Sequence, residues 1–187
     1  QSPLRMAFTK DKVISVPKSK GEGITTSTLI SCAWAHVLAQ YTGKSDVVFG
    51  DTISGRNVVD PSISSTVVGC CATNVPMRIR FADSSGQHSI LQLLNQVRDQ
   101  QRNRIPHEGV SFRSMIRECT DWSPANRFTS VVNHRPAKPA AKSASGQIGF
   151  QVSTITTEMK PLTTWYDLAV VSQENDGTVE MSLGYST

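Results

Sequence analysis

The sequence lacks long apolar runs and clusters of positive charge. No stretch approaches the roughly 20 consecutive apolar residues that a membrane-spanning helix requires, so no membrane association is expected. The net charge is +4, but no run of five or more Lys or Arg residues occurs. Nucleic-acid binding is therefore not expected, whereas a mild positive field favours an acidic protein partner.

The cysteines are few and irregularly placed. The four of them, Cys32, Cys70, Cys71 and Cys119, form neither a C-x-x-C pair nor an evenly spread set. This pattern indicates a reducing, cytoplasmic setting. We expect the adjacent pair Cys70 and Cys71 to be small, buried strand residues rather than a redox centre.

Recognisable catalytic motifs are also missing. The four histidines, His36, His88, His107 and His134, do not stand at metal-ligand spacing, so no metal site is predicted. No G-x-S-x-G elbow, Walker loop or G-x-G-x-x-G fingerprint is present. The residues by themselves therefore assign no catalytic residue and no directly bound cofactor to this chain.

The first half of the chain contains three strong structural signals. A helix is predicted over residues 26–42, with Thr25 or Thr26 as its cap and Gly43 as its stop. Its apolar residues at three- and four-residue spacing define the face expected to be buried: Leu29, Ile30, Ala33, Val37 and Tyr41. Strands are predicted over 46–53 and 67–81. In the second strand the alternation places Asn74, Arg78 and Arg80 opposite an apolar face: Val75, Met77, Ile79 and Phe81.

Helices and strands continue to alternate in the second half. Helices are predicted over 89–104, with the stripe Ile90, Leu94, Val97 and Gln101, and over 111–118. Strands are predicted over 13–16, 128–134 and 150–157. A closing hairpin, 166–173 with 178–185, has its turn at Asn175-Asp176-Gly177. Residues 18–23 and 138–146 are expected to be mobile loops. The fold class is therefore α/β, a two-layer sandwich with a mixed sheet.

Five segments, in order, resemble core motifs of nonribosomal peptide synthetase condensation domains. Residues 46–56 are similar to the family's D-V-V-x-G strand and its S/A-G-R loop. Residues 68–78 resemble the fifth motif, (I/V)-G-x-F-V-N-T-x-x-x-R, with Gly69, Asn74 and Arg78 matched to its Gly, Asn and Arg, while Cys71 and Ala72 depart from it. The other three segments are 107–112, which resembles (H/N)-Q-D-x-P-F; 121–135, which resembles the seventh motif and has a fungal character; and Tyr166-Asp167-Leu168 with Tyr185-Ser186-Thr187, which resembles the closing F-D-L and Y-S-T hairpin.

This resemblance implies a fold and a function. Condensation domains consist of two chloramphenicol-acetyltransferase-like lobes, and the N-terminal lobe carries the catalytic H-H-x-x-x-D-G motif. Carrier domains deliver aminoacyl and peptidyl thioesters on phosphopantetheine arms through a tunnel between the lobes, where an amide bond forms or the peptide cyclises. Because this sequence has no His-His pair, it corresponds to the C-terminal lobe. We expect residues 1–24 to continue from a missing N-terminal lobe, and the chain alone to be inactive. The implied partners are that lobe, peptidyl carrier domains and an adjacent adenylation domain.

The resemblance also assigns site residues. Asn74 and Arg78, on the polar face of their strand, are predicted to line the substrate tunnel together with Ser54, Gly55 and Arg56. Structural or interlobe roles are predicted for a second set: Asp121, Trp122, Trp165 and Tyr166. Two alternatives stay open, namely a catalytically inert docking module of the same family and a coenzyme A-dependent acyltransferase of the same superfold.

Overall fold

The helices and strands interleave along the chain. The computed structural model describes residues 6–9, 11–16, 23–64, 66–81, 89–137, 166–175 and 177–186. In chain order the elements are β1 (Met6–Phe8), β2 (Lys12–Ser15), α1 (Thr26–Thr42), β3 (Asp46–Ile53), the 3-10 helix η1 (Arg56–Val58), β4 (Thr73–Arg80), α2 (Ile90–Asn103), the 3-10 helix η2 (Ile105–His107), α3 (Phe112–Cys119), β5 (Ser130–Arg135), β6 (Leu168–Asn175) and β7 (Thr178–Ser186).

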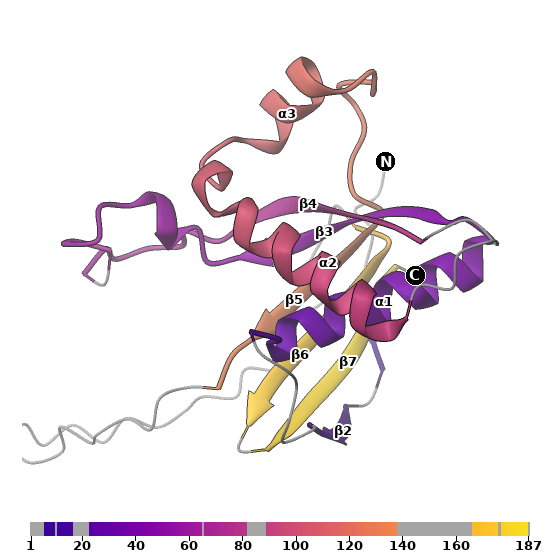
Figure 1. The fold of residues 1–187 in the computed structure, drawn as a ribbon. Helices are drawn as coiled ribbons and strands as arrows, with labels where there is room; N and C mark the ends of the chain where they lie inside the picture. The colour runs from indigo at the N-terminus through magenta and orange to yellow at the C-terminus, as the bar shows by residue number, and fades with distance from the viewer. Residues whose placement is uncertain are drawn as a thin grey trace, which may run out of the picture.

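The strands form one seven-stranded mixed sheet (Figure 1). Its order is β1-β7-β6-β5-β3-β4, and β2 pairs with β7 beside β1. The central pairs β3·β5 and β5·β6 are parallel, whereas β3·β4 and β6·β7 are antiparallel. The predicted mixed α/β sheet is confirmed.

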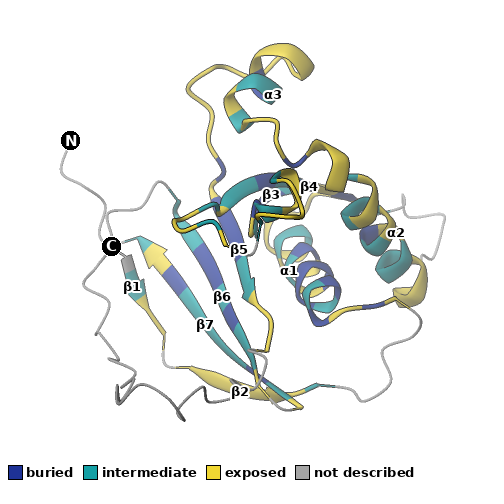
Figure 2. Cartoon of the chain, turned by 90° about the vertical axis from the view of Figure 1, so that its left-hand side faces the viewer, coloured by how far each residue is buried: buried dark blue, intermediate teal, exposed yellow. Residues whose placement is uncertain are grey.

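The two faces of the sheet carry two separate apolar clusters. The larger one lies between the sheet and helices α1 and α2; its strand residues include Phe49, Met77, Ile79 and Val132, each fully buried. The smaller one lies on the opposite face and is built on Phe128, Val131 and Ala169, with Phe112 of α3 packed against it. Burial thus follows strand parity, because alternate side chains point to opposite faces. Figure 2 shows α1 and α2 together on one side of the sheet and α3 apart from them.

The helix boundaries follow from local capping. The side chain of Thr25 accepts the N–H of Thr28 at the start of α1, and Gly43 ends this helix at φ 67°. Ser89 and Gln92 form a capping box at the start of α2. The side chain of Ser111 caps α3 by accepting the N–H of Ser114. The cap at Thr25 and the stop at Gly43 are those that the sequence predicts for α1.

The predicted buried face of α1 is wrong except at Ile30, which is buried. Tyr41 is 91% exposed, and Ala33 and Val37 are exposed as well. The helix instead buries a smaller, partly polar face: Thr26, Thr28, Ile30, Ser31, Cys32 and Ala35. Small side chains let α1 lie close to the sheet and to α2, where the hydroxyl of Thr28 donates to Gln101 Oε1 at 2.7 Å. Contacts with the sheet and α2, rather than the spacing of the apolar residues, therefore decide which face of α1 is buried.

The predicted stripe on α2 is right only in part. Val97 is fully buried and Leu94 packs against the main cluster. Ile90, however, is 78% exposed. It is the first residue of the helix, and the contacts with the main cluster begin at Leu93 and Leu94.

The long strand predicted over 67–81 is shorter than expected. It begins at Thr73, while residues 67–72 are irregular. The guanidinium of Arg56 binds the carbonyl oxygens of Val67 and Gly69, and Gly69 has φ 137°. These carbonyl groups therefore bind a side chain instead of a neighbouring strand. The expectation that Cys70 and Cys71 are buried is therefore also wrong: Cys70 is exposed and Cys71 half-buried. Within β4 the predicted alternation holds, with Val75, Met77 and Ile79 buried.

The closing hairpin is confirmed. β6 pairs with β7 from Leu168 opposite Tyr185 to Asn175 opposite Thr178, and Gly177 in the turn has φ 73°. The predicted strand at 150–157, the loops at 18–22 and 138–146, and Trp165 lie outside the described residues. None of the helices in the described ranges has the length and hydropathy that a membrane crossing requires.

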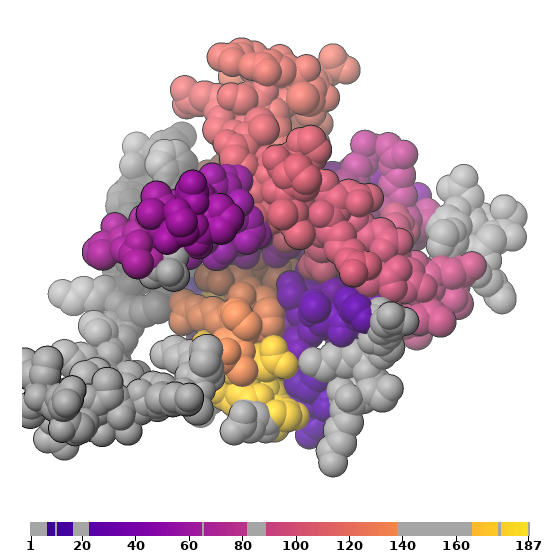
Figure 3. All heavy atoms as spheres, turned by 60° about the vertical axis from the view of Figure 1, so that its left-hand side comes forward, coloured from indigo at the N-terminus to yellow at the C-terminus, as the bar shows by residue number. Residues whose placement is uncertain are grey.

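The segment between β3 and β4 protrudes beyond the ends of these two strands. The purple trace of this segment runs away from the strands in Figure 1, and its atoms stand out beside those of α2 and η2 in Figure 3. It carries exposed apolar side chains at Val58, Ile63 and Val68, the last 98% exposed. We call residues 54–72 the protruding segment.

Candidate functional site

Asn74 is the centre of a hydrogen-bonded chain on the sheet face opposite α1 and α2. It stands directly across from Thr52 in the β3·β4 register. The Thr52 hydroxyl donates to Asn74 Oδ1 at 2.7 Å, and Asn74 Nδ2 donates to the Tyr166 hydroxyl. Burial raises the pKa of the Tyr166 phenol, while the bond from Asn74 opposes that shift. The phenol therefore stays protonated near neutral pH.

A hollow of about 300 Å³ adjoins this chain of residues. Asn74 and Tyr166 line it together with Phe112 and Phe128, whose ring centroids are 4.1 Å apart. The hollow thus combines aromatic walls with an amide and a phenol. Such a mixture suits a partly apolar ligand that is oriented by a few polar contacts.

Arg78 lies farther along the same face, at a second hollow. Its guanidinium makes two bonds to Asp46: Nε to Oδ1 at 3.0 Å and Nη2 to Oδ2 at 2.6 Å. The Arg78 hydrogen bonds lower the pKa of the Asp46 carboxyl. Gln100 of α2 donates to the backbone oxygen of Arg78 at 3.1 Å. The predicted common face of Asn74 and Arg78 is confirmed, but the two residues line different hollows.

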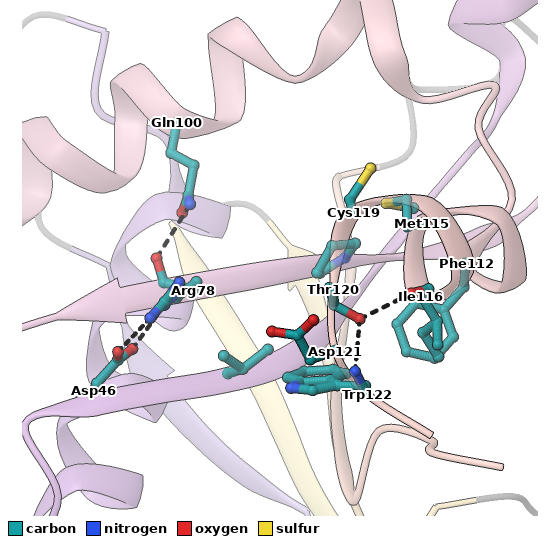
Figure 4. A pocket seen from close by; sticks show the side chains of 12 residues that line it. Asp46, Arg78, Gln100, Phe112, Met115, Ile116, Cys119, Thr120, Asp121 and Trp122 are labelled. Carbon is teal, nitrogen blue, oxygen red and sulfur yellow. Dashed lines mark hydrogen bonds and ion pairs between the residues drawn. The ribbon is translucent and has the colours of Figure 1, made fainter. Parts of the chain in front are cut away.

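The second hollow, of about 680 Å³, is shown in Figure 4. Its floor is formed by β3 and β4 with Asp46, Val48 and Arg78, and its other wall by α3 with Met115, Ile116 and Cys119. Asp121 and Trp122 close one side, and the backbone N–H of Trp122 donates to the Thr120 hydroxyl at 3.2 Å. Phe112 lines both hollows.

Ser54, Gly55 and Arg56 lie at the base of the protruding segment. Arg56 Nη1 donates to the carbonyl oxygens of Ser64 at 2.8 Å and Val67 at 3.1 Å, and Nη2 to that of Gly69 at 3.3 Å. A Cβ atom built on Gly55 would lie 2.0 Å from the carbonyl oxygen of Cys71. Gly55 and Arg56 therefore hold together the two arms of the segment, the one that leaves β3 and the one that leads back to β4.

A third hollow lies at the other face of the sheet and was not predicted. Ser54 borders it, together with a buried charged cluster of Asp51, Arg104 and Glu108. Arg104 Nη1 lies 2.6 Å from Asp51 Oδ2, and Arg104 Nε lies 3.7 Å from Glu108 Oε1. Asp51 is 2% exposed, and burial raises the pKa of its carboxyl despite the opposing effect of Arg104. Two sequence signals point to this cluster: Asp51 has the strand parity of Val47 and Phe49, and Arg104 and Glu108 are four residues apart.

The five predicted tunnel residues are thus not gathered in one hollow. Asn74 and Arg78 line separate hollows of one face, Ser54 lines a hollow of the other, and Gly55 and Arg56 brace a loop. Counted from Gly69 and Arg78, the fifth motif's Asn falls on Thr73 and its Thr on Asn74, so the two residues stand in exchanged order. No group of three or more His, Cys, Asp or Glu side chains in the described ranges is arranged to hold a metal ion.

Comparisons with known proteins identify what the chain is similar to. A family model for the condensation domain matches residues 16–187. Nonribosomal peptide synthetase 7 of Gibberella zeae is 81% identical over an alignment that covers 100% of this chain and 4% of that synthetase.

Solved structures show the same fold. The crystal structure of a protein named CT superposes with a TM-score of 0.77 at 24% identity, covering 100% of this chain and 41% of that one. The starter condensation domain of rhizomide synthetase RzmA superposes with a TM-score of 0.64 at 14% identity, covering 96% of this chain and 40% of that one. The sheet with helices on it is therefore the fold of condensation domains, as the sequence motifs predict. Since the family match extends over nearly the whole sequence, the chain belongs to the condensation-domain family.

Proposed function

We propose that this chain is one lobe, the C-terminal one, of a condensation domain that joins carrier-bound aminoacyl or peptidyl thioesters by amide-bond formation or cyclises the peptide. The observation that carries the proposal is the family match over residues 16–187. The chain spans 4% of its Gibberella zeae relative, a nonribosomal peptide synthetase. The activity would therefore belong to a larger assembly in which this lobe supplies part of the substrate tunnel.

The sheet face that carries Asn74, Tyr166 and Arg78 is the proposed tunnel wall. Its two hollows adjoin each other at Phe112, so a long, narrow ligand could run from one to the other. A primary amide has two donor hydrogens and two acceptor lone pairs. After its bonds to Thr52 and Tyr166, the Asn74 amide retains one of each to orient a thioester or an amine.

The protruding segment is the proposed contact with the other lobe. Val58, Ile63 and Val68 are all at least half exposed. Exposed apolar side chains on a loop that is anchored at its base are typical of a protein interface. Asp121, Trp122 and Trp165 keep the structural or interlobe roles proposed from the motifs, whereas Tyr166 joins the proposed tunnel wall through its bond to Asn74. Ser54, Gly55 and Arg56 are proposed to support the tunnel by shaping this segment.

The general base is proposed to come from the other lobe. Condensation domains carry the H-H-x-x-x-D-G motif there, and this sequence has no His-His pair. A positioned general base contributes typically 10²–10⁴-fold to a rate. The chain alone is therefore expected to be inactive.

The proposed partners follow from the same assembly. Carrier domains would bring the substrates on phosphopantetheine, an adjacent adenylation domain would load them, and the setting would be the cytoplasm. The net charge of +4 would help to attract an acidic carrier domain.

The proposal is tested by assaying two proteins with donor- and acceptor-loaded carrier domains. One is the condensation region of the parent reading frame, and the other is this 187-residue chain. Amide product from the first and none above background from the second supports the proposal. Robust product from the chain alone would refute the two-lobe assignment. A parent region that lacks H-H-x-x-x-D-G and gives no product would favour the inert docking module instead, and transfer from coenzyme A would favour the acyltransferase.

A further inference from the structure

The 3-10 helices η1 and η2 are joined by a hydrogen bond between an exposed residue and a buried carboxylate. Asn57 is exposed and lies in η1, at the base of the protruding segment. Its Nδ2 donates to Glu108 Oε2 at 2.8 Å, and Glu108, just after η2, is 6% exposed. Val58, the next residue, lies close to Gly109, with its Cγ1 3.3 Å from the position of a Cβ built on Gly109. The bond and this contact form a joint between η1 and the residues that follow η2.

The joint continues into the core through charged side chains. Glu108 Oε1 is paired with Arg104, and Arg104 is paired with Asp51 of β3. The cluster contains two buried carboxyl groups and one guanidinium, so Glu108 shares its one cationic neighbour in the cluster with Asp51, and that neighbour is 3.7 Å from Glu108 but 2.6 Å from Asp51. A buried charge needs hydrogen-bond donors in place of water. Within the described part of the chain, the Glu108 side chain accepts one hydrogen bond, and the amide of Asn57 donates it.

We propose that Asn57 is a positioning residue, which fixes the direction in which the protruding segment leaves the sheet by binding the buried Asp51–Arg104–Glu108 cluster. Arg56 braces the segment internally, but its three bonds all end on carbonyl oxygens of the segment itself. The Asn57–Glu108 bond is different, because it ties the segment to the residue after η2 and, through the ion pairs of Arg104, to Asp51 of β3. A carboxylate at position 57 would face the carboxylate of Glu108 and could not donate to it, whereas the amide does.

The consequence for the reaction rests on the proposed function. If the protruding segment contacts the other lobe, its direction sets how the two lobes meet around the tunnel. A small misplacement then reduces the rate of the chemical step more than it weakens substrate binding, because reacting groups must be held in a narrow range of geometry. The effect is expected in kcat rather than in KM for the loaded carrier domains.

The test uses the complete condensation region of the parent synthetase and the isosteric variant Asn57→Asp. Asn103→Asp, on the exposed end of α2, is the matched control. Hydrogen exchange over residues 54–72 is measured by mass spectrometry, and product formation is measured kinetically. Asn57→Asp is expected to speed exchange in the segment at least about tenfold, which is the factor for one lost hydrogen bond to a buried charge. It should also lower kcat more than it raises KM, and Asn103→Asp should do neither.

A double variant provides the rescue. Asn57→Asp combined with Glu108→Gln exchanges donor and acceptor, and exchange should return toward the parent rate. Equal exchange in Asn57→Asp and Asn103→Asp, or no rescue in the double variant, overturns the inference. If Asn57→Asp does not fold, Asn57→Ala, which removes the donor without adding charge, is held to the same criteria. Exchange does not depend on turnover, so an inactive parent region would refute the proposed function and leave the positioning role testable.

Discussion

The Asn74 amide is engaged on both sides, which makes it the most informative single residue of the proposed tunnel wall. It receives the Thr52 hydroxyl hydrogen on its oxygen and donates to Tyr166 from its nitrogen. Because the oxygen and the nitrogen are both in use, the orientation of the amide is fixed. A fixed amide can hold a substrate carbonyl or amine without the entropy cost of ordering a mobile side chain.

We predict that Asn74→Ala slows amide formation by the parent condensation region about 5- to 150-fold. That range corresponds to about 1–3 kcal/mol for a hydrogen bond lost in a desolvated site. Stability should fall less than activity, because the apolar side of β4 stays intact. The companion variant is Thr52→Val, which removes the hydroxyl that donates to the Asn74 amide and keeps the shape of the side chain at position 52. Unchanged turnover in Asn74→Ala, or simple unfolding, would show that Asn74 is a structural residue.

Asp51 gives a prediction for the pH dependence of stability. Burial raises the pKa of its carboxyl above the value of the unfolded chain, which is about 3.9. Between those two pKa values the folded state binds more protons than the unfolded state, so this residue's contribution to stability falls as the pH rises. Asp51→Asn removes that titration. We predict that the free energy of unfolding of Asp51→Asn, relative to that of the unsubstituted protein, increases as the pH rises above about 4, because only the unsubstituted protein loses stability through this group.

The measurement is urea denaturation of the parent condensation region at several pH values from about 4 upward. Arg104 keeps Glu108 as a partner in the variant, so the guanidinium is not left without a counter-charge. A difference between the two proteins that is independent of pH, or that changes in the opposite direction, would contradict the assigned shift of the Asp51 pKa.

At the scale of elements, the protruding segment depends on a close approach between its two arms. Gly55 has φ 65°, and the carbonyl oxygen of Cys71 occupies the space where a side chain would stand. Gly43, at the end of α1, has nearly the same φ, 67°, and no atom lies within 4 Å of the position that a Cβ would take there. The two glycines share a backbone conformation and differ in crowding.

We predict that Gly43→Ala costs about 1 kcal/mol, the strain of a left-handed residue with a side chain. Gly55→Ala should cost about 1–3 kcal/mol more, because the arms must move apart to admit the methyl group. For a domain of 150–250 residues, each kcal/mol lowers the melting temperature by about 2–4 °C. Thermal melting of the two variants compares them directly. Equal losses would mean that the segment opens without cost and is not braced as described.

Elements with local signals could be predicted from the sequence, and those set by distant contacts could not. α1 and β3 begin and end where capping residues and an apolar run predict, and the Asn175 and Gly177 turn places the hairpin. The start of β4 could not be predicted, because the carbonyls of Val67 and Gly69 bind Arg56 rather than a strand. Parity correctly put Asn74 and Arg78 on one face, but the bond from Asn74 to Tyr166 joins residues 92 positions apart in the sequence.

For the molecule as a whole, the two faces of the sheet have different roles. One face is covered by α1 and α2 over the main apolar cluster, and it buries the Asp51–Arg104–Glu108 cluster at its end. The other face carries the smaller cluster and the two hollows that meet at Phe112. A lobe that provides one wall of a tunnel needs such an open face, and in the proposed assembly the protruding segment would contact the other lobe.

The most direct measurement is a structure of the parent condensation region with a phosphopantetheine arm that carries a non-hydrolysable analogue of the amide-forming intermediate. The arm is predicted to pass over the face of β3 and β4 opposite α1 and α2, within contact distance, about 4 Å, of Asn74 and Phe112. The protruding segment should touch the lobe that bears the catalytic histidines. An arm bound on the α1 and α2 side, or a tunnel that this chain does not line, would contradict the assignment.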